Sequence, residues 1–203
     1  PAIVVIAFNR EKSLKRLLDS IANAHYSSDQ ITLHISIDAS ENSKVKEVAD
    51  EFNWMYGEKV VDVKTENYGL LKHVLSCGAL TDKYGAIIVL EDDLVVAPNY
   101  YNYAIKANDF YYNDNKIAGV SLFTYSAEEG DFYPFEPIND GSDVHFIQVA
   151  SSWGQLWNNN QWNEFNQWLN DNPQGDESLL PDYIRKWDLS SWKKLFVSYM
   201  ISS

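Results

Sequence analysis

Residues 85–96 read GAIIVLEDDLVV, and this stretch decides the fold. Its apolar run, Ile87 to Leu90, is typical of a strand that is buried on both faces of a parallel sheet. Three consecutive carboxylates follow, Glu91, Asp92 and Asp93. Because open α/β sheets bind ligands beyond the carboxyl ends of their strands, we expect these acids to lie at a ligand site.

The acidic triplet needs a partner of opposite charge. Three adjacent anions repel one another, so the arrangement costs stability unless a hard cation, a basic side chain or backbone donors hold it. A bound Mg²⁺ or Mn²⁺ is the simplest explanation, since these ions often take only one or two protein carboxylates beside substrate phosphates. The competing interpretation is a solvated turn whose aspartates cap the next segment.

The composition is that of a globular protein. With 203 residues, 45% hydrophobic content and 22% charged residues, we expect one domain over residues 1–203. No apolar segment approaches the roughly 20 residues that span a bilayer. The formal net charge of −13 argues against nucleic acid or anionic lipid as a partner, because both require a basic face.

Cys77 is the only cysteine, which excludes a disulfide within the chain and a multi-cysteine zinc site. We therefore expect a reducing, cytoplasmic environment. The chain starts at Pro1, almost directly before a strand-like segment, and stops at Ser203 after a helical segment without a terminator. We expect that the start is trimmed and that the full protein continues further.

The first 125 residues alternate strand-like and helix-like segments. Leu14, Leu17, Leu18 and Ile21 have the i, i+3, i+4, i+7 spacing of an amphipathic helix that packs on a sheet. This alternation indicates a largely parallel, doubly wound sheet. The expected strands are 3–8, 31–37, 60–65, the segment ending at 90, and 117–123, and further helices are expected at 45–52, 70–80 and 100–112.

The composition changes after Tyr125. Residues 128–141 are rich in Asp, Glu, Gly and Pro and indicate a loop over the site. One more strand is expected at 146–149. Six of the seven tryptophans follow, and we expect most to be core and one or two to line a pocket.

Candidate nucleotide contacts follow the first two strands. Arg10 comes after the first strand, and its guanidinium can donate to a base carbonyl or a phosphate; Asp38 ends the second and can accept from a base N–H or a ribose hydroxyl. The alternatives are a surface arginine and an Asx-turn. Both residues fall at the same predicted sheet edge as Asp92 and Asp93.

The segment 66–73, ENYGLLKH, opens a helix after the third strand. Gly69 permits close approach of the backbone, and the helix N-terminus and His73 could contact a phosphate. The alternative is an ordinary helix start. Cys77 on the same helix is most simply a core residue.

Two candidates lie in the tryptophan-rich part. Trp153, in SSWGQLWNNNQW, could lay its indole face against a sugar ring, although tryptophans at such spacing more often pack a core. Asp182, in LPDYIR, is a lone carboxylate, and a helix N-cap is a strong alternative role for it.

The order of these motifs resembles the GT-A glycosyltransferases, and in detail N-acetylglucosaminyltransferase I and related family-2-like bacterial enzymes. VVIAFNR at 4–10, ID at 37–38 and EDDL at 91–94 carry the resemblance, and the last resembles the Asp-x-Asp motif. The resemblance implies an α/β fold of the GT-A, nucleotide-diphospho-sugar transferase type: a Rossmann-like sandwich with a mostly parallel central sheet. It also implies a nucleotide-sugar-binding half at 1–125 and an acceptor-side half at 126–203.

The same resemblance implies roles for single residues. Asp93 would bind Mn²⁺ (or Mg²⁺), which bridges the nucleotide diphosphate, while Asp92 and Glu91 would contact the ribose and the donor sugar. Arg10, Asp38 and His73 would complete the donor site, Trp153 would lie beside the acceptor pocket, and Asp182 would be the catalytic base. The competing candidates for the base are Glu164, Asp171, Asp176 and Glu177.

The expected function is an inverting, metal-dependent transfer of a hexosyl or N-acetylhexosaminyl group from a nucleotide-diphosphate sugar, a UDP-sugar, to a hydroxyl of a glycan or other acceptor. A sugar-phosphate nucleotidyltransferase is an alternative, but it requires a Gly-rich loop where this chain has Phe8 to Glu11. A non-catalytic carbohydrate-binding module is a second alternative, which would leave the acidic triplet without a purpose.

Overall fold

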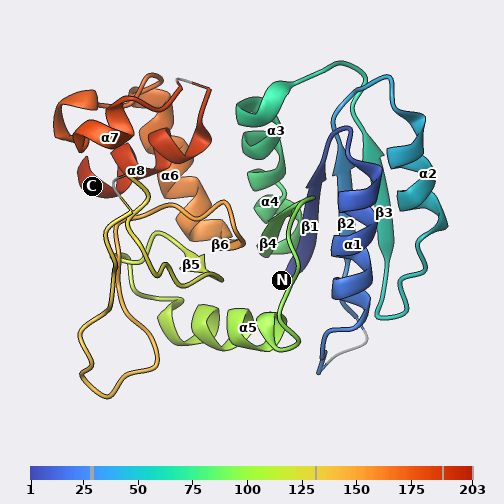
Figure 1. Cartoon of the computed structure of the whole chain (residues 1–203), viewed down its shortest axis with the longest axis horizontal. Coiled ribbons are helices and arrows are strands. Elements are labelled where there is room, and N and C mark those ends of the chain that lie inside the picture. The colour runs from blue at the N-terminus through green and yellow to red at the C-terminus, as the bar shows by residue number, and fades with distance from the viewer. Residues whose placement is uncertain (28–29, 131, 189, 203) are drawn as a thin grey trace.

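The computed structural model describes residues 1–27, 30–130, 132–188 and 190–202. Within these ranges six strands form one sheet in the order β3-β2-β1-β4-β6-β5 (Figure 1). The strands are β1 Ala2–Ala7, β2 Leu33–Ile37, β3 Lys59–Val63, β4 Ala86–Glu91, β5 Val120–Ser121 and β6 Gln155–Asn158. The first four run parallel to one another, and β6 is antiparallel to both β4 and β5.

Helices cover both faces of this sheet (Figure 1). Val5 on β1 belongs to the core under α1, α2 and α5, whereas its neighbours Val4 and Ile6 belong to the core under α3, α6 and α8. Every residue of β1 is therefore buried, as is usual for a parallel strand between two helical layers. The helices are α1 Glu11–Ala22, α2 Ser43–Glu51, α3 Gly69–Gly78, α4 Thr81–Tyr84, α5 Tyr100–Tyr111, α6 Asn159–Asp171, α7 Asp182–Arg185 and α8 Trp192–Ser202, with a 3₁₀ turn at Glu177–Leu179.

The register of the parallel strands places their carboxyl ends at one edge. Ala7 of β1 pairs with Ile37 of β2, and Ile6 of β1 pairs with Glu91 of β4. The residues that follow these three strands are therefore neighbours, although they lie far apart in the sequence.

The prediction of a strand at 146–149 is wrong. That segment is irregular, and the side chain of Phe146 is 70% exposed, so it offers no apolar face to a core. The strand of this region is β6 instead, where Leu156 and Trp157 are fully buried. The strand expected at 117–123 is reduced to Val120–Ser121, because it pairs only with the short β6.

The tryptophans divide as expected. Trp157, Trp162 and Trp192 are buried and pack on one another around Phe196, whereas Trp153 is 49% exposed and lines a pocket. Cys77 is buried in the same core, as predicted.

Candidate functional site

Arg10 joins the ends of two neighbouring strands. It follows β1, and its Nη1 donates to Oδ2 of Asp93 at 3.0 Å, while its Nη2 forms a short ion pair with Oδ1 of Asp92. Both aspartates follow β4. The guanidinium is therefore the cation that holds two of the three carboxylates in the structure.

The three acids of the triplet differ in exposure. The side chain of Asp92 is only 3% exposed, and burial raises its pKa, against the opposing effect of Arg10. The side chain of Asp93 is 44% exposed. Asp93 is therefore the carboxylate that solvent or a ligand reaches most readily.

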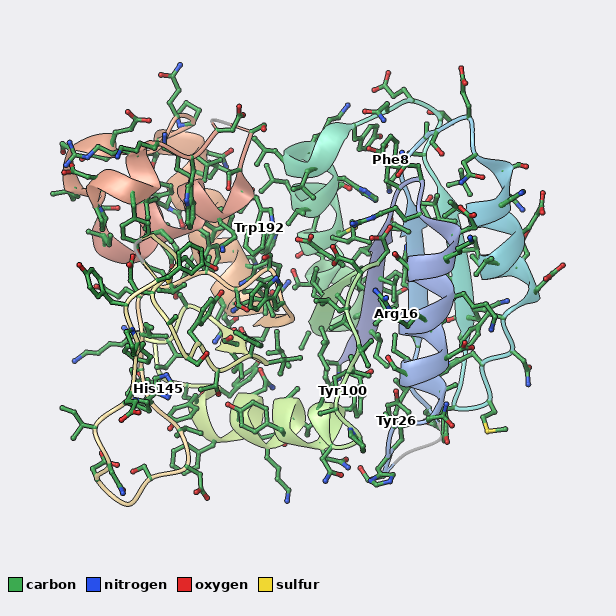
Figure 2. The ribbon with its side chains drawn as sticks, in the orientation of Figure 1. Phe8, Arg16, Tyr26, Tyr100, His145 and Trp192 are labelled. Carbon is green, nitrogen blue, oxygen red and sulfur yellow. The ribbon has the colours of Figure 1, made fainter. Side chains whose placement is uncertain are left out.

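Glu91 lies in a different environment from the two aspartates. Burial, together with the negative charge of Asp93, raises its pKa to about 7, and a hydrogen bond from the Trp192 side chain opposes this shift. Trp192 begins α8, on the side of that helix that is toward the central sheet (Figure 2). Glu91 thus links the triplet to the C-terminal helix.

The main chain after the triplet is held by α1. Nη2 of Arg16, labelled in Figure 2, donates to the carbonyl oxygen of Asp93 at 3.0 Å, and Oγ of Ser20 accepts from the Val96 amide at 3.1 Å. Sequence reasoning missed Arg16, Ser20 and Trp192 as parts of this site. Their contacts join segments more than 70 residues apart, and no local motif indicates them.

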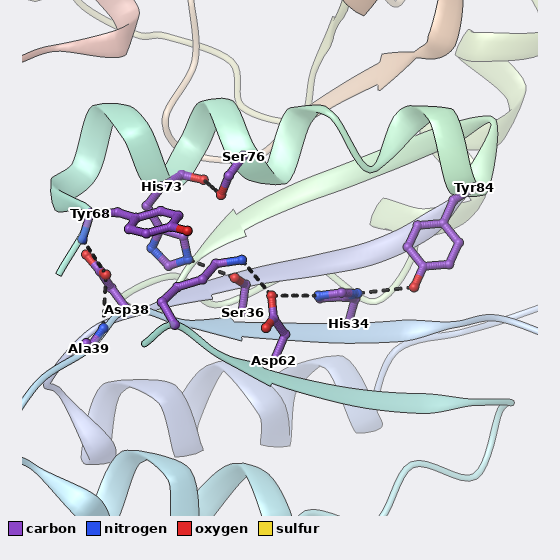
Figure 3. A network of polar contacts seen from close by, with 10 residues as sticks. His34, Ser36, Asp38, Ala39, Asp62, Tyr68, His73, Ser76 and Tyr84 are labelled. Carbon is purple, nitrogen blue, oxygen red and sulfur yellow. Dashed lines mark hydrogen bonds and ion pairs between the residues drawn. The ribbon is translucent and has the colours of Figure 1, made fainter. Parts of the chain in front are cut away.

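Asp38 anchors the start of α3. Its Oδ1 accepts from the backbone amides of Ala39 at 2.9 Å and Tyr68 at 2.8 Å (Figure 3). Its Oδ2 accepts from the backbone amide of Gly69 at 3.0 Å. Gly69 has φ +69°, a conformation that glycine adopts without strain. Asp38 is itself only 3% exposed, so in this structure its carboxylate mainly holds the backbone around it.

His73 lies beside Asp38 but is 2% exposed. Its Nε2 is 2.8 Å from Oγ of Ser36 on β2 (Figure 3). Burial lowers its pKa to about 4, although the charge of Asp38 opposes the shift. The imidazole ring is therefore neutral at pH 7, and it packs in the core beside the turn that Asp38 holds. The expected contact between His73 and a donor stays a prediction.

We expect the pH dependence of stability to change in the variant His73→Gln. Because the folded pKa lies near 4 and the usual value is 6.5, neutral His73 contributes stability above pH 6.5 that is lost as the pH falls toward 4. The contribution is up to about 3 kcal/mol. The measurement is the free energy of unfolding in urea between pH 4 and 7.5.

The comparison must be made between variant and wild type at each pH. Burial raises the pKa of Glu91 to about 7, so Glu91 makes the free energy of unfolding rise as the pH falls over much of the same range. In the wild type alone, this opposes the loss of stability that is due to His73. The difference in free energy of unfolding between wild type and His73→Gln should shrink as the pH falls. A constant difference would show that the pKa of His73 is the same in the folded and the unfolded protein.

The structure does not bring Asp182 to the triplet through any described contact. It begins the four-residue helix α7, its side chain is 85% exposed, and it pairs with Arg185 at 2.9 Å. The competing acids Glu177 and Asp176 also have local partners, Lys194 and Ser178 respectively. The role of a base stays a prediction for Asp182.

The remaining two competitors lie on α6, with Glu164 near the Tyr199 hydroxyl and Asp171 as the last residue of the helix. Trp153 lies elsewhere, with its ring edge-to-face on Phe123 at 4.4 Å and stacked over Tyr125 at 6.0 Å. Its position fits a pocket wall.

Three comparisons identify the class of protein. A family model described as glycosyl transferase family 2 matches residues 2–173. The alpha-1,3-mannosyl-glycoprotein 2-beta-N-acetylglucosaminyltransferase of Arabidopsis thaliana is 24% identical over 231 residues, which cover 98% of this chain and 50% of the relative. The chain thus spans about half the length of this curated relative.

Solved structures share the fold. S. aureus TarS 1-349 in complex with UDP has a TM-score of 0.58 at 15% identity, covering 98% of this chain and 55% of that one. The complex of the same protein with UDP-GlcNAc has a TM-score of 0.57 at 14% identity, covering 99% and 53%.

The chain therefore belongs to glycosyl transferase family 2. Its fold is the GT-A sandwich with a mostly parallel central sheet, as the sequence predicts, and it is similar to the N-acetylglucosaminyltransferases. Membership of this family agrees with the expected glycosyltransferase class. Among the described residues, no helix is long and apolar enough to cross a membrane.

Proposed function

We propose that this chain transfers a sugar from a UDP-sugar to a hydroxyl of a glycan or other acceptor, with inversion at the anomeric carbon and with the help of Mn²⁺ or Mg²⁺. The observation that carries this proposal is the meeting of three strand ends. Asp38 after β2, Arg10 after β1 and Asp93 after β4 lie at one edge of a parallel sheet, where α/β proteins bind nucleotides.

Each of these residues suits one part of a nucleotide diphosphate. A carboxylate at the position of Asp38 can accept from a base N–H, as on a uracil ring. Arg10 can donate to phosphate oxygens once it leaves the aspartates. The TarS structures hold UDP and UDP-GlcNAc, and this supports uridine as the nucleoside.

The carboxylates fit a hard metal ion that shares its shell with the donor. Among the described residues, no group of three or more His, Cys, Asp or Glu side chains could hold a metal by itself. Asp93 offers one accessible carboxylate, and Mg²⁺ or Mn²⁺ accepts such a site when substrate phosphates complete the shell. When bound there, the ion would stabilise the negative charge that develops on the leaving diphosphate.

The chain's own residues provide the rest of the chemistry. Asp38, Arg10 and the α3 start would orient the donor, with residues 1–125 acting as the donor half. Residues 126–203 would form the acceptor half, in which Asp182 removes the proton of the attacking hydroxyl. A single in-line displacement inverts the anomeric centre, so no carboxylate is required as a covalent nucleophile.

Thermal unfolding tests the donor proposal under four conditions: with Mn²⁺ alone, with UDP alone, with Mn²⁺ and UDP, and with Mn²⁺ and GDP. We expect Mn²⁺ alone to stabilise little, because one carboxylate is a weak site, and Mn²⁺ with UDP to stabilise most. At a ligand concentration 100 times the dissociation constant the gain is about 2.7 kcal/mol. If UDP with Mn²⁺ or Mg²⁺ does not stabilise the protein, the proposal of a UDP-sugar donor fails, and stabilisation by GDP alone would assign the site to another nucleotide.

A further inference from the structure

A pocket of about 520 Å³ opens directly after the acidic triplet. Its aliphatic wall includes Leu94 and Val95, the two residues that follow Asp93, and Leu122 after β5. Its aromatic wall includes Tyr103 of α5 and Trp153. The volume is in the range of small-molecule sites, and the 63% exposure of Val95 and the 49% exposure of Trp153 show that the pocket is accessible.

The lining is apolar in character. None of the lining residues is charged, and two of the polar side chains are already engaged: the Tyr100 hydroxyl lies 3.1 Å from that of Tyr26, and Oδ1 of Asn99 lies 3.1 Å from Nδ1 of His25. The Tyr103 hydroxyl, the Trp153 indole N–H and the amide nitrogen of Asn99 are the other polar side-chain groups of the lining. A buried sugar ring would leave most of its hydroxyls without partners here, at a cost of about 1–3 kcal/mol each.

The position of the pocket ties it to the reaction. Leu94 and Val95 extend the chain that carries Asp93, and Leu90 of β4 also lines the pocket. Arg16 and Ser20 hold this connection in place from α1. A group in the pocket would therefore lie next to the proposed metal carboxylate.

We propose that this pocket binds an apolar group of the acceptor, an alkyl or aryl substituent beside the hydroxyl that receives the sugar. This inference rests on the proposed glycosyl transfer for the identity of the ligand as an acceptor. An apolar lining favours such a group because binding removes the apolar surface of both the group and the pocket from water. Trp153 and Tyr103 can in addition cover the adjoining sugar ring with their faces.

Binding of two model acceptors without donor or metal tests the pocket separately from the donor site. The probes are n-octyl and methyl β-D-glucoside at submicellar concentration, measured by calorimetry or by intrinsic tryptophan fluorescence. We expect the octyl glycoside to bind on the order of 10-fold or more tightly than the methyl glycoside, because each buried methylene adds apolar area. Equal affinity for the two would overturn the proposal.

The variant Val95→Asp places a charge in the pocket and should remove the preference for the octyl glycoside. Met55→Asp is the matched control, since Met55 is 72% exposed and does not line the pocket, and it should bind like wild type. Tyr103→Ser is a second pocket variant in case Val95→Asp fails to fold. If folded pocket variants keep the full preference, the octyl chain binds elsewhere and the proposal is wrong.

The two proposals can fail independently. Stabilisation by UDP with Mn²⁺ reports on the donor site, and the octyl preference reports on the pocket. If UDP with Mn²⁺ does not stabilise the protein but the octyl preference is present, the pocket is an apolar binding site in a protein that uses another donor. The reverse result would leave the transferase proposal intact and remove the apolar acceptor.

Discussion

We expect Asp93→Ala to abolish the manganese-dependent binding of UDP. The physical reason is that Asp93 is the accessible carboxylate of the triplet, with 44% of its side chain exposed, while Asp92 is buried against Arg10. Under the proposal, the metal would lose its protein ligand in this variant, and a contribution of several kcal/mol corresponds to an affinity loss on the order of 100-fold or more. Calorimetric titration of UDP in the presence of Mn²⁺ measures it.

The fold of this variant should be unaffected. The ion pair of Asp93 with Arg10 is half-exposed on both sides, and such pairs contribute little to stability. Asp50→Ala is a suitable control because Asp50 also forms an exposed ion pair, with Lys46, on the distant helix α2. An unchanged UDP titration with Mn²⁺ in Asp93→Ala would show that Asp93 is not the metal ligand.

Titration in the presence of a chelator separates the metal from direct contacts. If Asp93→Ala weakens binding only when Mn²⁺ is present, the carboxylate acts through the metal. Equal losses with and without Mn²⁺ would indicate a direct contact between Asp93 and the nucleotide.

The parallel half of the fold could be predicted because its signals are local. The apolar runs of β1, β2 and β4 and the spacing of Leu14, Leu17, Leu18 and Ile21 in α1 each identify an element without knowledge of the others. Parallel strands also end at one edge, so the meeting of Arg10, Asp92 and Asp93 could be expected from strand ends alone.

The antiparallel half was harder to predict. β5 and β6 are short, and the polar residues Gln155 and Asn158 leave β6 without an alternation of apolar and polar residues. Both side chains are buried, and each accepts a hydrogen bond from a backbone amide, which the sequence does not indicate. Asn158 ends the strand and caps α6 at the same time. The segment 146–149 has a more strand-like composition but lies in an irregular loop.

The contacts that complete the site are long-range. Trp192 reaches Glu91 from a helix about 100 residues further along the chain, and Arg16 reaches the Asp93 carbonyl from α1. A sequence pattern indicates which residues are at a strand end, but it does not indicate which helix packs over it. This is why the meeting of the strand ends could be expected from the sequence, whereas the contacts from α1 and α8 could not.

We expect Asp182→Asn to spare donor binding and to lower the rate of transfer by about 10²–10⁴-fold, the contribution of a positioned general base. The substitution keeps the shape of the side chain but removes its ability to take a proton. Since no described contact connects Asp182 with the triplet, UDP affinity with Mn²⁺ should equal that of wild type. Steady-state transfer to an acceptor and calorimetric titration of UDP are the two measurements.

The pair with Arg185 provides the matched control. Arg185 lies 2.9 Å from Asp182, so Arg185→Gln removes the charge that orients the carboxylate but leaves the carboxylate itself. We expect Arg185→Gln to lose much less activity than Asp182→Asn, and Glu177→Gln, which removes a partner of Lys194, to retain wild-type transfer. If Asp182→Asn turns over at the wild-type rate, the base is another acid, and a loss in Glu177→Gln would assign the role to Glu177.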